Sequence, residues 1–182
     1  ALIDQALSNG VTDVHPLTGA EARALEPALS PSVRSGFRVP GEHLIDPWSA
    51  AHGYLLQALA NGAQLMREAE VLAGRWSGDR WHLATTAGGV TAELVINAAG
   101  LWGDEVDRRV TGESWFTIKP RKGQFVVYDK TAAALAGHIL LPVPTKITKG
   151  IVVCRTAFGN LLVGPTAEEQ DDRDHATLDR AT

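Results

Sequence analysis

The sequence is poor in residues that build cross-links and metal centres. Its single cysteine, Cys154, excludes an internal disulfide and any cysteine-ligated zinc or iron–sulfur centre within this chain. Because Cys154 ends the apolar run 151–154, we expect it to be a small core residue. The six histidines include no H-E-x-x-H motif and no pair four positions apart. The sequence therefore predicts no metal site.

Common motifs of nucleotide-binding and hydrolytic proteins are also missing. The chain contains no G-x-G-x-x-G, G-x-x-x-x-G-K-[ST] or G-x-S-x-G, which excludes the usual phosphate-binding loops and the nucleophile elbow of hydrolases. No stretch approaches the ~20 apolar residues that span a bilayer. The 17 basic and 21 acidic residues leave a net charge of −4, so nothing favours nucleic acid or an anionic membrane as a partner.

What is present is an ordinary globular composition. The 182 residues are 45% hydrophobic and 21% charged, enough for one domain or two small lobes. The first residue is Ala1, and both ends, 1–7 and 174–182, have helix-like patterns without caps. We therefore expect a piece of a longer protein, in which no targeting signal can be recognised. We expect that protein in the cytoplasm, and leave open its association with a membrane.

Capping, turn and alternation signals predict most elements. The capping box of Thr18 and Glu21 predicts a short helix from about residue 19 to 27, and Asp46-Pro47 predicts a helix that Gly62 ends. Apolar residues lie on more than one face of that second helix, so we expect it between layers. Further predictions are a strand over 34–39, a hairpin over 71–76 and 80–86, a strand over 90–93, a helix over 104–109, and strands over 124–128, 139–141, 151–155 and 161–163.

The run from Leu94 to Trp102 is the most informative stretch. Residues 94–97 are expected to form a strand buried on both faces, followed by the turn Ala98-Ala99-Gly100, which has no bulky side chain. Such a turn lets a ligand approach backbone amides, because ligands of open α/β sheets lie beyond the carboxyl ends of the strands. Tight packing of strand against helix explains the spacing equally well. Trp102 either lies against a flat cofactor or fills the core.

Positive charge is concentrated between residues 114 and 164. All five lysines (119, 122, 130, 146 and 149) lie there with two arginines, opposed by Asp129 alone, which leaves a local balance of +6. Three of these charges lie in Lys119-Pro120-Arg121-Lys122, which we interpret as a binding segment for an anionic substrate. Solvated strand edges are the alternative for each single lysine. His43, in the loop before the Asp46-Pro47 helix, is a second candidate, although loop histidines more often only face solvent.

The order of these segments resembles the D-amino acid oxidase-like family of FAD-dependent oxidoreductases, in its glycerol-3-phosphate dehydrogenase and 2-hydroxyglutarate oxidase branch. The resemblance covers about residues 17 to 170. It rests on these stretches: Leu44-Ile45-Asp46-Pro47, Asn61-Gly62-Ala63, Val71, Val95–Trp102, Ile118–Phe125 and Gly159–Thr166.

The resemblance implies a role for particular residues. Val71 would hold the adenine end of FAD through its backbone, Ala98, Ala99 and Gly100 would approach the dinucleotide, and Trp102 would stand near the flavin. Arg121 and Lys122 would contact the substrate, and we add His43 to that set. The family's N-terminal glycine-rich loop and C-terminal Gly-Arg-Pro stretch are absent from this sequence. We therefore expect this central fragment alone to lack FAD and to be inactive.

The expected fold class is α/β to α+β, with a partial FAD-binding, Rossmann-like half and a mostly antiparallel substrate lobe. We expect residues 1–40 to belong to the substrate lobe, 41–112 to form the partial FAD domain with a β-meander, 113–170 to form the antiparallel lobe, and 171–182 to be a truncated helix. The expected partners are a small anionic substrate and the remaining segments of the parent chain.

The expected function of the parent is oxidation of a hydroxy acid, amino acid or glycerol 3-phosphate by hydride transfer to flavin. A non-catalytic α+β binding or interaction module is the alternative, because a fold does not determine a function. An NAD-dependent dehydrogenase is a third reading, which the missing glycine-rich loop disfavours.

Overall fold

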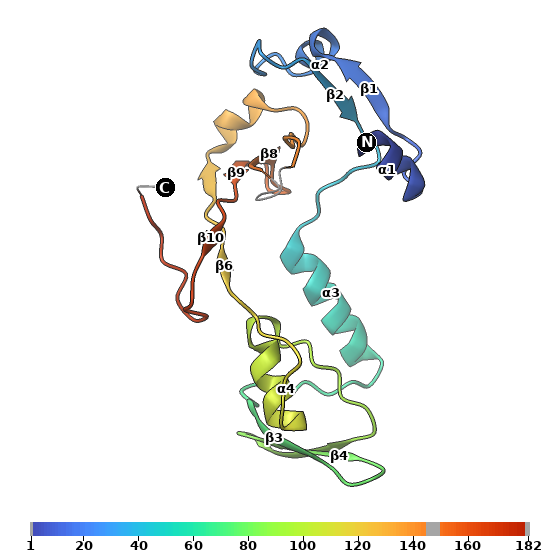
Figure 1. Ribbon diagram of the computed structural model, residues 1–182, viewed down its shortest axis with the longest axis vertical. Coiled ribbons are helices and arrows are strands. Elements are labelled where there is room, and N and C mark those ends of the chain that lie inside the picture. Colours follow the sequence, from blue (N-terminus) through green and yellow to red (C-terminus); the bar gives the residue numbers. More distant parts are fainter. Residues whose placement is uncertain (1, 145–149, 181–182) are drawn as a thin grey trace. The chain divides into compact units, whose positions relative to one another are not determined.

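The computed structural model describes residues 2–144 and 150–180. The chain forms two compact units, each built from two stretches of sequence (Figure 1). Unit 1 contains Ala1–His52 and Gly123–Thr166, and unit 2 contains Gly53–Lys122 and Ala167–Thr182. The mixture of helices and antiparallel sheets agrees with the expected fold class. Assignment of the predicted domain ranges to cofactor and substrate stays a prediction.

The N-terminal part of unit 1 is a two-stranded ribbon whose strands are connected through a helix. After α1 (Leu2–Ser8), β1 (His15–Thr18) pairs antiparallel with β2 (Ser35–Arg38), and α2 (Gly19–Leu25) lies between them in sequence. The predicted capping box is confirmed: the Thr18 hydroxyl accepts the Glu21 amide, and the Glu21 carboxylate accepts the Thr18 amide. Strand β1 was not predicted, because Pro16 is untypical of a strand outside sheet edges.

The rest of unit 1 is a three-stranded antiparallel sheet. Strand β9 (Leu161–Gly164) lies between β7 (Val126–Tyr128) and β8 (Val152–Arg155), and η2 (Lys130–Leu135) follows β7. Cys154 and Leu161 are buried, which confirms the core position expected for the cysteine. The strand predicted over 139–141 is reduced to one bridge, between Leu140 and Val153. Two of the lysines counted above, Lys146 and Lys149, lie outside the described residues.

Unit 2 contains the predicted meander and a helix packed on it. Strands β3 (Val71–Trp76), β4 (Trp81–Thr85) and β5 (Gly88–Ala92) pair in sequence order, and α4 (Gly103–Thr111) packs against β3 (Figure 1). A Cβ at Gly74 would lie 2.9 Å from the Val110 Cα, so glycine permits this close packing. The hairpin turn places Gly78 at φ +105°. The predicted hairpin and α4 are therefore confirmed.

A short ribbon completes unit 2. Strand β6 (Arg121–Lys122) pairs antiparallel with β10 (Glu168–Glu169). The helix predicted over 171–182 is wrong for the described part, residues 171–180, which contains no helix. Instead, the Asp172 carboxylate accepts the amides of Asp174 and His175. Aspartate competes with helical hydrogen bonding in this way, which explains the departure from the apolar spacing.

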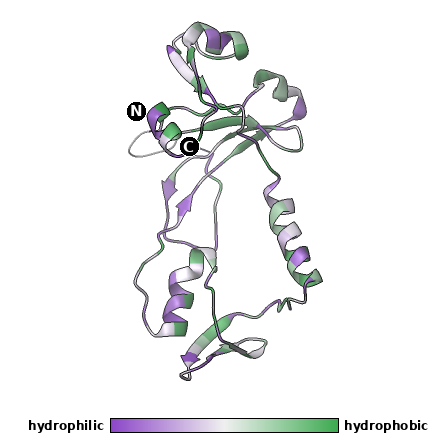
Figure 2. Cartoon of the chain, turned by 90° about the vertical axis from the view of Figure 1, so that its right-hand side faces the viewer, coloured by the Kyte–Doolittle hydropathy of each residue, from purple (hydrophilic) through white to green (hydrophobic). Residues whose placement is uncertain are grey.

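Helix α3 (Pro47–Ala60) begins and ends where the sequence predicts. The Asp46 carboxylate caps the amides of Trp48 and Ser49, and Gly62 follows the helix at φ +91°. Figure 2 shows hydrophobic and hydrophilic residues alternating along this helix. The expected burial between layers is not found, because no residue of α3 is buried and Trp48 and Tyr54 are about 80% exposed (80% and 81%).

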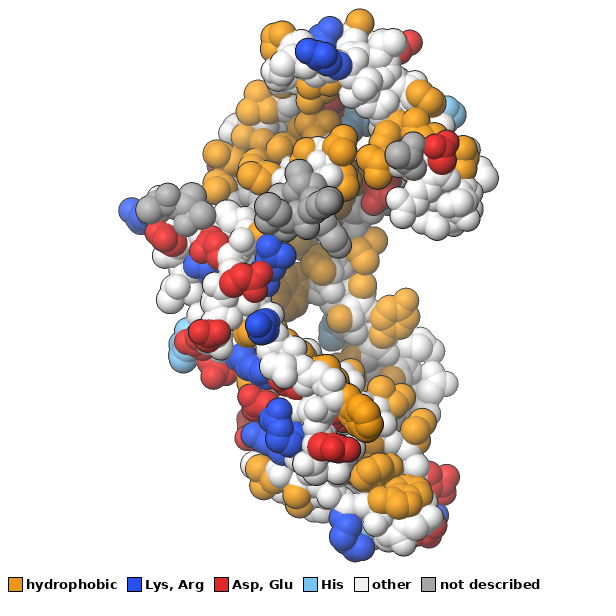
Figure 3. Space-filling model, in the orientation of Figure 1, with side chains coloured by type: hydrophobic (Ala, Val, Ile, Leu, Met, Phe, Trp, Pro, Cys, Tyr) orange, Lys and Arg blue, Asp and Glu red, His pale blue; other side chains and the backbone are white. Residues whose placement is uncertain are grey.

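The strand predicted over 94–97 does not form. These residues have no regular secondary structure, and Leu94 and Ile96 are 74% and 81% exposed. Apolar side chains do not supply hydrogen-bond partners for a backbone, and the described strands pair among themselves. Figure 3 shows such exposed hydrophobic side chains across the face it displays.

Two features are absent from the described residues. In the described part of the chain, no helix is long and apolar enough to cross a membrane. Among the same residues, no group of three or more histidine, cysteine or acidic side chains is placed to hold a metal ion.

Candidate cofactor-binding turn

The predicted turn is shaped by Asn97 and a left-handed glycine. The Asn97 Oδ1 accepts the Ala99 amide at 3.2 Å, and its Nδ2 donates to the Gly103 carbonyl at 2.7 Å. Gly100 lies at φ +57° and opens the single 3₁₀ turn η1 (Gly100–Trp102). The Trp102 amide then donates to the Ala99 carbonyl at 3.2 Å. One side chain thus holds both ends of the turn, although no strand precedes it.

The turn leaves main-chain donors open. Over residues 2–144 and 150–180, no acceptor receives the amides of Ala98, Gly100 or Leu101. A Cβ placed on Gly100 would meet nothing within 4 Å, so the side of the turn that it would occupy is open space. Consecutive amides that lack internal partners are suited to anionic oxygen atoms. The residues present therefore fit the close approach of a dinucleotide that was predicted for Ala98, Ala99 and Gly100.

A buried carboxylate that the sequence did not single out follows the turn directly. Asp104 is 1% exposed and accepts the amides of Glu105 at 3.0 Å and Ile118 at 3.1 Å. Its two oxygens also receive both terminal nitrogens of Arg173, at 2.6 and 2.8 Å. The hydrogen bonds from Arg173 lower the pKa of Asp104 far below its usual range and outweigh the opposing effect of burial. Asp104 therefore stays charged.

The sequence carries little signal for this pair. Asp104 reads as an ordinary acidic residue in the first turn of a helix, where it favours the helix dipole. Arg173 lies 69 positions away in a segment predicted to be helical. No spacing rule connects two residues of this kind.

The basic segment is balanced by acidic residues beyond residue 164. Arg121 pairs with Glu169 at 3.3 Å, and Lys122 pairs with Glu168 at 3.0 Å across the β6–β10 ribbon. The Lys122 amine also donates to the Thr177 carbonyl at 3.1 Å, and its side chain is only 11% exposed. Lys119 is exposed and makes no ion pair with the described residues. Substrate binding by Arg121 and Lys122 stays a prediction.

His43 lies in a different part of the molecule from the other predicted site residues. It is exposed in the loop that precedes α3, and it belongs to unit 1. The turn, Val71, Arg121 and Lys122 all belong to unit 2. A contact of His43 with substrate stays a prediction.

Comparison with known proteins decides the family. The model of the FAD dependent oxidoreductase (DAO) family matches residues 1–182. The chain belongs to this family. The predicted resemblance to D-amino acid oxidase-like flavoproteins is therefore confirmed, and FAD is the cofactor of the family.

Relatives of this FAD-dependent oxidoreductase chain include enzymes of glycerol 3-phosphate. Glycerol 3-phosphate dehydrogenase of Caloramator mitchellensis is 28% identical over 172 residues, which cover 94% of this chain and 36% of that protein. Glycerol 3-phosphate oxidase of Mycoplasma pneumoniae is 30% identical over 166 residues, which cover 89% of this chain and 43% of that protein. The chain thus spans less than half the length of these relatives.

Solved structures agree with the fold. The Mycoplasma pneumoniae L-alpha-glycerophosphate oxidase, dithionite-reduced and with FAD bound, matches with a TM-score of 0.85 at 27% identity, over 94% of this chain and 46% of that one. L-proline dehydrogenase from P. horikoshii matches with a TM-score of 0.81 at 21% identity, over 94% of this chain and 46% of that one, which shows the fold alone.

Val71 and Trp102 are two further residues that were predicted to bind the cofactor. The Val71 carbonyl accepts the Arg109 Nη1 at 2.9 Å, and the same nitrogen pairs with Glu70 at 2.6 Å. Trp102 is 39% exposed at the end of η1, so it is not a core plug. Adenine binding by Val71 and flavin contact by Trp102 stay predictions.

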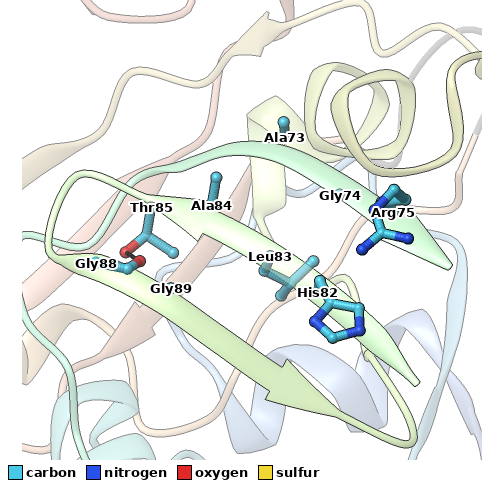
Figure 4. A pocket seen from close by; sticks show the side chains of 9 residues that line it. All are labelled: Ala73, Gly74, Arg75, His82, Leu83, Ala84, Thr85, Gly88 and Gly89. Atoms are coloured by element: carbon cyan, nitrogen blue, oxygen red, sulfur yellow. Dashed lines mark hydrogen bonds between the residues drawn. The ribbon is translucent and has the colours of Figure 1, made fainter. Parts of the chain in front are cut away.

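Unit 2 has a small hollow beside the turn and a wider one over the meander. A small one of about 110 Å³ adjoins the turn; its lining residues are Trp81, Val95, Asn97, Val106, Asp107, Val110 and Thr111. A wider, open one of about 490 Å³ lies over the meander (Figure 4). Arg75 and His82 face each other across β3 and β4 there, and the other lining residues are Ala73, Gly74, Leu83, Ala84, Thr85, Gly88 and Gly89. No predicted site residue lines the wider hollow.

Proposed function

We propose that the protein containing this chain oxidises a small anionic substrate, with glycerol 3-phosphate as the first candidate and hydroxy acids and amino acids as the others. Membership of the FAD dependent oxidoreductase family supports the reaction class. The names of the two glycerol 3-phosphate enzymes support the substrate. When bound, FAD accepts the hydride that leaves the substrate carbon.

The contribution of this chain to cofactor binding is the turn at Gly100. Its open amides offer hydrogen bonds to anionic oxygens of the dinucleotide, and its lack of a side chain at Gly100 permits close contact. This single observation carries the proposal, because it combines a backbone conformation that favours glycine with donors that the described chain leaves unused. Asn97 keeps the turn in this shape before the cofactor arrives.

The basic segment is proposed to hold the anionic group of the substrate. Lys119 offers an ammonium group without an ion-pair partner in the described part of the chain. Arg121 is half exposed (48%), so a phosphate or carboxylate can share its guanidinium with Glu169. His43 is proposed to complete the substrate contacts. Fixing the anion would orient the reacting C–H bond toward the flavin.

The cofactor proposal is tested by changing glycine to valine at two left-handed positions of the full-length protein. Gly100→Val fills the proposed contact surface, whereas Gly78→Val also places a β-branched residue at a positive φ, but in the β3–β4 hairpin, away from the turn. We expect Gly100→Val to lose most of its bound FAD and Gly78→Val to retain it, measured by flavin absorbance per folded protein. Equal flavin content in Gly100→Val and the unchanged protein would show that this turn does not contact FAD.

The substrate proposal is tested separately by turnover with an artificial electron acceptor. The panel contains glycerol 3-phosphate, several 2-hydroxy acids and several D-amino acids. We expect glycerol 3-phosphate to give the highest kcat/KM, and Lys119→Gln to raise KM more than it lowers kcat, because it removes a group that binds the anion. A preference for uncharged alcohols or amines would contradict an anionic substrate.

A further inference from the structure

Arg173 connects three segments of unit 2 through one guanidinium group. Its Nη1 donates to the Leu101 carbonyl at 2.7 Å and to Asp104, and its Nη2 donates to the Ile118 carbonyl at 3.1 Å and to Asp104. Glu105 adds a weaker contact at 3.4 Å. The Arg173 side chain is 16% exposed and the Asp104 side chain 2%. All donors of the two terminal nitrogens are thus directed at protein atoms.

These contacts reach the candidate turn at one particular peptide group. The peptide between Leu101 and Trp102 has its carbonyl bound by Arg173 and its N–H bound by the Ala99 carbonyl. A peptide group is planar, so fixing both ends fixes its orientation. The amides of Gly100 and Leu101 directly precede this peptide group, so fixing its orientation narrows the directions that they can take.

The segment that carries Arg173 is itself anchored. The Gln170 amide donates to the Pro120 carbonyl at 3.2 Å, and Asp172 orders residues 174 and 175. Further along the same segment, the Thr177 carbonyl accepts a hydrogen bond from the Lys122 amine. Arg173 therefore approaches the turn from a segment whose path is fixed on both sides.

We propose that Arg173 and Asp104 are positioning residues that hold the turn over residues 99–102 in its FAD-binding shape. This inference rests on the proposed function of the turn. Asp104 acts as the counter-ion that orients the guanidinium, and Arg173 acts on the Leu101 carbonyl. Neither side chain touches the cofactor, since their hydrogen-bonding groups are directed at each other and at the backbone. Arginine is required because a lysine ammonium cannot serve these four acceptors from one plane.

The test uses the full-length protein and the same conservative change at two sites. Arg173→Lys keeps the positive charge but removes the planar guanidinium group. Arg80→Lys is the matched control, because Arg80 forms an exposed pair with Glu93 at 3.2 Å. We expect Arg173→Lys to raise the Kd for FAD, titrated into folded apoprotein, by roughly tenfold. Arg173→Gln should raise it further, and Arg80→Lys should leave it unchanged. The Gly100→Val variant is measured alongside.

The outcomes separate this inference from the function on which it rests. If Gly100→Val loses FAD while Arg173→Lys binds it as tightly as the unchanged protein, the positioning role is wrong and the turn remains the cofactor site. If Gly100→Val binds FAD normally, the site itself is wrong, and the positioning role is overturned with it. A fall in FAD affinity that only parallels loss of folded apoprotein would indicate a purely structural role and overturn the inference.

Hydrogen exchange of the unchanged protein gives an answer that does not depend on any variant. Coupling between two sites is reciprocal, so FAD should slow exchange both at residues 98–103 and at residues 172–175. Slower exchange at the turn alone would overturn the positioning role.

Discussion

Each unit contains a buried carboxylate that accepts an amide from a distant loop, but the partners of the two carboxylates differ. In unit 1, Glu26 is 5% exposed and accepts the Gly137 amide at 2.8 Å and the His138 Nδ1 at 2.5 Å. In unit 2, Asp104 accepts two amides and a two-pronged arginine. An imidazole can lose its charge, whereas a guanidinium stays charged in proteins. The two sites thus differ in the side chain that faces the carboxylate, an imidazole in unit 1 and a guanidinium in unit 2.

The side chains that face the two carboxylates also differ in exposure. The His138 side chain is 39% exposed, and the Arg173 side chain is 16% exposed. A partly exposed pair exchanges one partner for water at small cost, whereas removing one member of a buried pair leaves an uncompensated charge. We infer that the Asp104–Arg173 pair, next to the proposed cofactor-binding turn, is more rigid than the Glu26–His138 pair.

The largest effect is expected from Asp104→Asn. This change keeps the shape of the side chain but removes the main counter-ion of Arg173 in a buried position, where only the longer contact with Glu105 remains. We expect the loss of stability of the full-length apoprotein, measured by urea unfolding, to be roughly two to three times that of Glu26→Gln. Equal losses in the two variants would contradict the contrast between the sites.

Glu26→Gln is expected to have the intermediate effect. The amide oxygen still accepts the Gly137 amide, but the side chain no longer carries the negative charge that faces His138. A loss of about 1–3 kcal/mol is expected from urea unfolding. The pairing is tested by a double-mutant cycle with His138→Gln, in which the two losses should not add.

As the pH falls, we expect the contacts of Glu26 to be lost before the contacts of Asp104. Burial would raise the pKa of Glu26, but hydrogen bonds from Gly137 and His138 outweigh it and lower the pKa below the ordinary value of 4.5. The pKa of Asp104 is lowered much further, chiefly by Arg173. A lowered carboxyl pKa stabilises the folded state above the ordinary value, and this stabilisation is lost as the pH falls through the folded-state pKa. Below about pH 4.5, Glu26 therefore loses its charge first.

Hydrogen exchange measures this separation directly. The Gly137 amide reports on Glu26, and the Ile118 amide reports on Asp104. We expect protection at Gly137, corrected for intrinsic rates, to fall at a higher pH than protection at Ile118. The reverse order would show that the arginine does not hold the second connection in acid.

The smallest effect is expected from Thr18→Ala. This change removes the capping box of α2, the helix that ends next to Glu26. A loss of about 1 kcal/mol is typical for an exposed cap. The pH at which the Gly137 amide loses protection should stay the same, because the cap does not contact the carboxylate. A shift of that pH would show that the whole helix positions Glu26.

Local signals predicted the fold best where a few neighbouring residues decide the outcome. The Thr18 cap, the Asp46 cap and the Gly78 hairpin turn each act within four positions of sequence, and all three are confirmed. The predicted strand over 94–97 failed because a strand depends on a partner elsewhere, which side-chain pattern does not reveal. The predicted helix after residue 170 failed because Asp172 folds back on its own amides.

In the candidate site, too, a local feature could be predicted and a pair of residues distant in sequence could not. Gly100 could be predicted from the absence of bulk in Ala98-Ala99-Gly100, and the structure places it in the left-handed region. Asp104 and Arg173 could not, because each has an ordinary local sequence and their pairing arises from the path of the chain. Their role follows only from the positions of the atoms that they bind.

The β6–β10 ribbon places a constraint on chain length. Its two rungs set Lys122 against Glu168 and Arg121 against Glu169, and Arg173 follows only four positions after Glu169. Deleting or inserting one residue over 170–172 would displace the guanidinium by about 3.3 Å, the rise of one residue in extended chain. No hydrogen bond tolerates such a displacement. This stretch should therefore accept exchanged side chains far more readily than a change in its number of residues.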